Sequence, residues 1–162
     1  MYATTAERVP AGKAEVKAAA VRLAPYVAGP SLAQQTLSQR FVAAAKRELP
    51  LTTADDAWIV WRGTELNSGD RVTLAAVERQ GNTFTIRATE TIWMGGYDKN
   101  VPSCPCLGAN LGKLPPGKYE VEWVVTVTAN YPADQLPVPA TPAPPKVTPG
   151  LRLQFEVVLA DR

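Results

Sequence analysis

Two long segments alternate apolar and polar residues, and this pattern constrains the fold more than any other feature of the sequence. In 119–127 the odd positions are apolar: Tyr119, Val121, Trp123, Val125 and Val127. In 151–159 the odd positions are again apolar: Leu151, Leu153, Phe155, Val157 and Leu159. A period of two is that of a β-strand with one face buried. The sequence therefore predicts two half-buried strands, the first of which is preceded by a turn at Leu114-Pro115-Pro116-Gly117-Lys118.

A hairpin is predicted further upstream, with strands over 72–79 and 83–93 joined at Gln80-Gly81-Asn82. Gly and Asn tolerate the left-handed backbone that tight turns require. We expect one face of the second strand to be buried, with Phe84, Ile86, Ala88 and Ile92, and the other to carry Thr83, Thr85, Arg87, Thr89 and Thr91. A further strand over 57–62 has tryptophans on both faces, which favours an interior position in a sheet.

The first fifty residues have mixed patterns. The segment Lys13–Leu23 fits either a strand or an Ala-rich helix. The segment 31–49 predicts a helix, with Ser31 as N-cap and Pro50 after its end, and a strand over 40–45 is the alternative.

The segment 132–149 is rich in proline, which donates no backbone hydrogen bond. We expect an extended excursion between the last two strands. The whole chain, 1–162, is predicted to be one domain and mostly β: a β-sandwich or partly open barrel with one appended helix at about 31–49.

The chain contains no histidine, and this excludes His-based acid–base catalysis, His-activated nucleophiles and most zinc and copper sites. The paired carboxylates Glu120 and Glu122, or Asp55 and Asp56, leave a carboxylate-only hydrolase as a minor alternative. We predict no catalytic residue, no metal site and no cofactor.

Charge, hydropathy and the N-terminal pattern indicate which partners and which cellular location to expect. A net charge of +2, with no basic run beyond Lys46-Arg47, predicts no nucleic-acid binding. No window is apolar for long enough to span a bilayer. The residues from Met1 to Pro10 lack the pattern of a secretory signal, so the protein is either cytoplasmic or has had a signal removed.

Cys104-Pro105-Cys106 is the one motif that suggests a specific chemistry. It lies in the segment 95–112, which we predict to be a loop. Two thiolates supply two ligands of a soft-metal site, but a closed site needs about four ligands. A disulfide between the two cysteines would be strained and labile. The interpretations are a loop whose cysteines are merely tolerated or structurally paired, a redox or regulatory disulfide, or a metal or intermolecular bond.

Candidate contacts with a protein partner gather around the predicted loops 95–112 and 132–149. Aromatic, methionine and proline side chains favour such contacts. The candidates are Trp93, Met94, Tyr97, Tyr131, Pro142, Pro144 and Pro145.

Part of the sequence resembles a known family. The similarity is carried by the strand Trp58-Ile59-Val60-Trp61-Arg62-Gly63, the step Ser68-Gly69-Asp70-Arg71-Val72 and a strand pair that ends Phe84-Thr85-Ile86-Arg87-Ala88-Thr89-Glu90-Thr91. These elements make 56–91 similar to PrcB-like bacterial envelope domains. Asp70 and Arg71 replace that family's aromatic after the glycine. The segment 114–121 is similar to strand openers of secreted immunoglobulin-like modules. Both resemblances imply an extracytoplasmic location, periplasmic, envelope or secreted.

The sequence therefore predicts a non-enzymatic interaction or structural subunit of a bacterial envelope or secreted assembly, which binds protein partners through 95–112 and 132–149. The alternative is a thiol-based redox or metal-handling protein that uses Cys104 and Cys106.

Overall fold

The computed structural model describes residues 2–10, 17–22, 50–62, 66–96, 103–132, 134, 146–148 and 152–160. These residues form strands and no helix, which confirms the mostly-β prediction. A four-stranded sheet has the order β1 (Ala3–Pro10), β7 (Ser103–Gly112), β4 (Ala57–Arg62), β2 (Lys17–Arg22). A six-stranded sheet has the order β3 (Leu51–Thr52), β10 (Arg152–Val158), β8 (Gly117–Asn130), β6 (Thr83–Trp93), β5 (Arg71–Gln80), and β9 (Lys146–Thr148) also pairs with β8.

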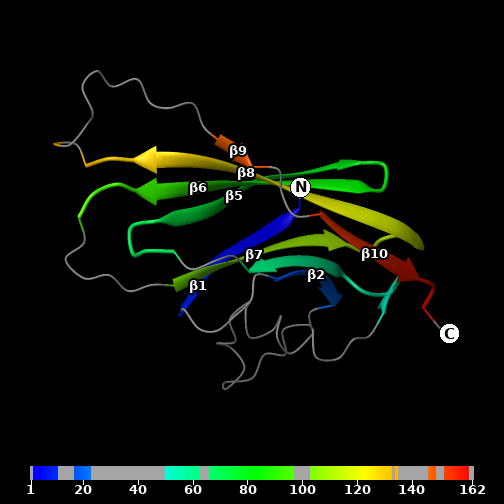
Figure 1. The fold of residues 1–162 in the computed structure, drawn as a ribbon. Helices are drawn as coiled ribbons and strands as arrows, with labels where there is room; N and C mark the ends of the chain where they lie inside the picture. Colours follow the sequence, from blue (N-terminus) through cyan, green and yellow to red (C-terminus); the bar gives the residue numbers. More distant parts are fainter. Residues whose placement is uncertain are drawn as a thin grey trace.

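The two sheets pack face to face around one core. Figure 1 shows β5, β6, β8 and β9 in one layer, above β7, β1 and β2. The edges of the layers also approach each other, because β1 contacts β5 and β2 contacts β10 and β3. The result is a sandwich that is closed far enough to resemble a partly open barrel. Both layers contribute to the core, whose largest members are Trp123, Phe84, Ile59, Ile86 and Leu107.

The alternating segments form the strands that their pattern predicts. In β8 the core-facing residues Tyr119, Val121 and Trp123 are buried, while Glu120 and Glu122 alternate with them. In β10 Val157 is buried, but Leu159 lies beyond the end of the strand and is 71% exposed. The alternation therefore predicted the strand correctly, but the expected burial of Leu159 is wrong.

The predicted hairpin is also present. Gly81 lies in the left-handed region with a φ of 60°, and the register pairs Gln80 with Thr83 across the turn. Phe84, Ile86 and Ala88 are buried as expected. Ile92 is 36% exposed, so its predicted burial is wrong. The reason is that β6 runs to Trp93, whereas Ala88 is its last residue in the hydrophobic core.

Three further predictions concern the segments before residue 63. β4 lies between β7 and β2, which confirms its interior position. Residues 17–22 form a strand, so the strand alternative holds for that part of Lys13–Leu23. The predicted helix over 31–49 and its alternative strand over 40–45 lie outside the described residues.

The prediction of a loop over 95–112 is wrong for residues 103–112, which form the interior strand β7. The segment contains Pro105, Gly108 and Gly112 and shows no alternation, since residues 104–109 are all buried. Both faces of β7 are therefore packed, and small side chains allow that packing. A strand that is buried on both faces lacks the period of two from which strands are predicted.

The predicted excursion over 132–149 also needs correction, because Lys146–Thr148 form the short strand β9. β9 pairs antiparallel with Val125–Val127 of β8, along the same edge on which β10 pairs with residues 117–122. Within the rest of that segment only residues 132 and 134 are described.

Candidate functional site

The strands β6 and β8 are parallel neighbours and end together. Their register runs from Thr83 opposite Glu120 to Trp93 opposite Asn130. Beyond it, the backbone N–H of Met94 donates to the carbonyl of Asn130 at 2.9 Å. Figure 1 shows both arrowheads on the left, at the end away from the β5–β6 hairpin. The segments that follow Trp93 and Asn130 therefore leave the sheet side by side, although 37 residues separate these two positions in sequence.

Trp93 is fixed in place by close contacts with backbone. A Cβ atom at Gly69 would lie 2.5 Å from the Cβ and Cγ atoms of Trp93, and one at Gly95 would lie 2.6 Å from its indole ring. The indole Nε1 donates to the carbonyl of Gly96 at 3.2 Å. The ring therefore lies against two glycines, and any side chain larger than hydrogen at either position would displace it.

Asp70 connects Trp93 to the turn that precedes β5. It is 5% exposed and is the one buried charged residue among those whose burial the structure describes. Its Oδ1 accepts the backbone N–H of Trp93 at 2.8 Å, and its Oδ2 accepts that of Asn67 at 3.0 Å. Hydrogen bonds to a carboxylate are stronger than those between neutral groups. Asp70 thus holds the end of β6 against the 67–70 turn.

A second carboxylate lies close to Asp70. Glu90 is half-buried on β6, opposite Val72 of β5 and Val127 of β8. Burial raises the pKa of the Glu90 carboxyl above its ordinary value, and the nearby charge of Asp70 raises that pKa further. No local pattern in the sequence singles out Asp70 and Glu90 as a pair. The hairpin register could have predicted that Asp70 lies near the end of β6, because counting back from the Gly81–Asn82 turn brings residue 70 opposite that end.

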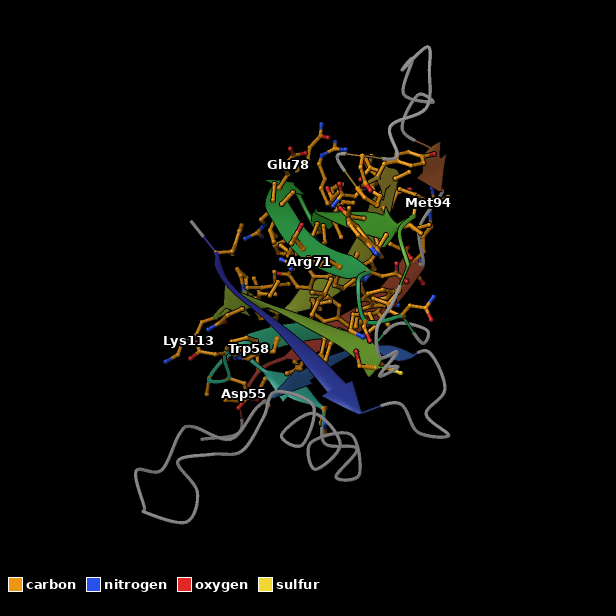
Figure 2. The ribbon with its side chains drawn as sticks, turned by 90° about the vertical axis from the view of Figure 1, so that its left-hand side faces the viewer. Asp55, Trp58, Arg71, Glu78, Met94 and Lys113 are labelled. Atoms are coloured by element: carbon orange, nitrogen blue, oxygen red, sulfur yellow. The ribbon has the colours of Figure 1, made fainter. Side chains whose placement is uncertain are left out.

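Of the predicted contact residues, the structure brings together Trp93, Met94 and Tyr131. Met94 is 49% exposed, and Ile92 beside it is also exposed, whereas Trp93 and Tyr131 are half-buried. Pro132 packs near Gly95, since a Cβ atom at Gly95 would lie 2.7 Å from the proline Cγ. In Figure 2, which looks onto this end, Met94 lies on the right and Lys113 and Asp55 on the left. Tyr97, Pro142, Pro144 and Pro145 lie outside the described residues.

The two cysteines lie in β7 and not in a loop. Both are thiols, with Cys104 3% and Cys106 0% exposed. They are two positions apart on one strand and therefore share a face. Their Cβ atoms lie about 6.6 Å apart, because a strand rises about 3.3 Å per residue, whereas a disulfide needs about 3.5–4.5 Å. A disulfide between them would require β7 to break.

The described residues contain no cluster of three or more Cys, Asp or Glu side chains arranged to hold a metal ion. In the same part of the chain no helix has the length and apolar character needed to cross a membrane. No protein-family model, curated protein or solved structure significantly matches this chain.

Proposed function

We propose that the chain is a non-enzymatic interaction module that binds a protein partner at the end of the β6–β8 pair. The observation that carries this proposal is the register of Trp93 with Asn130. Because of this register, the segments that follow β6 and β8 begin next to each other. Loops on a rigid scaffold are where binding residues concentrate.

At this surface Trp93 is held in place, and apolar side chains are exposed beside it. Asp70 and the two glycines hold Trp93 in one position. Met94 and Ile92 expose apolar side chains beside it. A preorganised surface loses little conformational entropy on binding, and exposed methionine and aromatic side chains are enriched in interfaces. The expected partner is therefore a protein that buries Met94 and Ile92.

An envelope or secreted location is part of the same proposal. Its support is the similarity of 56–91 and 114–121 to envelope and immunoglobulin-like domains. A local geometry agrees with the second similarity. Near the start of β8 the hydroxyl of Tyr119 donates to the carbonyl of Pro115 at 2.8 Å, four residues upstream. Such a bond resembles the tyrosine corner of immunoglobulin-like sandwiches.

The proposal is tested with a photo-cross-linking amino acid at position 94 in the source organism. Lys113, which is exposed and lies away from Met94, provides the matched control position. We expect one discrete cross-linked species from position 94 and none from position 113. Met94→Glu should remove the partner from the purified native protein, and Lys113→Glu should retain it. A native protein that purifies as a lone monomer, without cross-links at position 94, would contradict the proposal.

A further inference from the structure

A polar groove lies on the outer face of the six-stranded sheet, near the β5–β6 turn and at the other end of β6 from Met94. Its volume is about 530 Å³. Six polar side chains line it: Asn82, Thr83, Lys118, Glu120, Gln154 and Glu156. Tyr119 and Phe155 also border the groove, but their rings stack on the opposite, core-facing side of the sheet.

The strand register brings these side chains into two rows. Thr83 and Gln154 are both opposite Glu120, on either side of β8. Glu156 is opposite Lys118 in the next row. Since paired residues of neighbouring strands share a face, these side chains converge from three strands that are separated in the sequence.

Several of the lining groups are held in place. The side-chain amide of Asn82 donates to the carbonyl of Lys118 at 3.1 Å, and the backbone N–H of Glu120 donates to the carbonyl of Asn82 at 3.0 Å. Arg152 lies 3.9 Å from the Glu120 carboxylate and 3.4 Å from that of Glu122. The turn and the start of β8 are therefore joined, and the Glu120 carboxylate has a cation beside it.

The chemistry of the lining indicates the class of ligand. Amide, hydroxyl, carboxylate and ammonium groups together supply both donors and acceptors. The charges largely offset one another, because Lys118 is opposite Glu156 and Arg152 lies beside both Glu120 and Glu122, which leaves three carboxylates against two cations. A strongly charged ligand gains little from such a site. The groove is open to solvent along the sheet face, and its volume of about 530 Å³ leaves room for a sugar unit.

We propose that this groove binds a neutral saccharide unit, whose hydroxyl groups match its alternating donors and acceptors. This inference is independent of the partner surface, because no groove residue belongs to the Trp93–Met94 end. Either proposal can therefore fail without the other.

The test is an NMR titration of the ¹⁵N-labelled chain with glucose, N-acetylglucosamine, cellobiose and chitobiose, and separately with spermidine and inorganic phosphate. We expect saturable amide shifts at 82–83, 118–120 and 154–156 with at least one of the four sugars. Gln154→Ala should weaken that binding by about tenfold, the effect of one lost hydrogen bond in the site. Thr83→Ala should weaken it also.

Matched controls are Gln80→Ala and Thr85→Ala, on the same sheet face but outside the groove. These variants should bind as the parent does. The ¹⁵N spectrum of each variant shows whether it is folded. The absence of saturable shifts with all four sugars would overturn the proposal, and so would equal weakening by the controls or saturable binding of spermidine or phosphate alone.

Discussion

The Asp70 carboxylate accepts the backbone N–H of Trp93 at 2.8 Å and so joins positions 23 residues apart in sequence. The same carboxylate also accepts the N–H of Asn67. These bonds place the end of β6 relative to the turn before β5. The stability of the proposed binding end therefore depends on one buried charge.

Asp70→Ala should lower the free energy of unfolding by about 1–3 kcal/mol, because both N–H groups lose a charged acceptor. Urea denaturation measures this change. Asp56→Ala is the control, since Asp56 is exposed, and its effect should stay within about 0.5 kcal/mol. Equal effects of the two substitutions would show that Asp70 contributes nothing beyond an ordinary surface acid.

Gly69→Ala should displace the Trp93 side chain, because the added Cβ would lie 2.5 Å from its Cβ and Cγ atoms and 2.6 Å from its Cδ1 atom. Overpacking of this kind costs about 1–3 kcal/mol, and the near-UV circular dichroism of the tryptophans should change. Gly96→Ala is the matched control, since a Cβ there meets nothing within 4 Å. An unchanged spectrum and stability in Gly69→Ala would show that Trp93 is not held against that backbone.

Glu90 should make the protein less stable as the pH rises. Because its pKa is raised in the folded state, the folded chain binds the proton more tightly than the unfolded chain. The contribution is fully present below the ordinary glutamate pKa and is lost as the pH rises through the folded pKa. Glu90→Gln should therefore gain stability relative to the parent at neutral pH and not in acid.

Urea unfolding of the parent and of Glu90→Gln at several pH values between acid and neutral measures this difference. Glu78→Gln serves as the control, because Glu78 lies on the exposed face and pairs there with Arg87 at 3.3 Å. A stability difference between Glu90→Gln and the parent that does not change with pH would contradict the expectation.

Cys104 and Cys106 should react slowly with a thiol reagent in the folded protein and rapidly in denaturant, because both are buried in β7. Mild oxidation of the folded chain should leave two thiols, since the strand holds them too far apart to bond. Thiol titration and intact mass measure both outcomes. Rapid formation of an internal disulfide without unfolding would restore the redox alternative.

The sequence by itself determined the strands whose pattern is local. Alternation identified β8 and β10, and Gly81-Asn82 identified the turn that sets the register of β5 with β6. It also excluded histidine chemistry. Each of these features depends on neighbouring residues or on composition, so no distant contact is needed to recognise it.

Tertiary structure alone decided three other features. β7 became an interior strand because its residues are packed on both faces, which removes the alternation. β6 and β8 became parallel neighbours although β7 separates them in sequence, and this brings the partner candidates Trp93, Met94 and Tyr131 together. The groove exists only where β6, β8 and β10 meet. Pairing between distant segments depends on the packing of the whole chain, and local residue patterns do not carry that information.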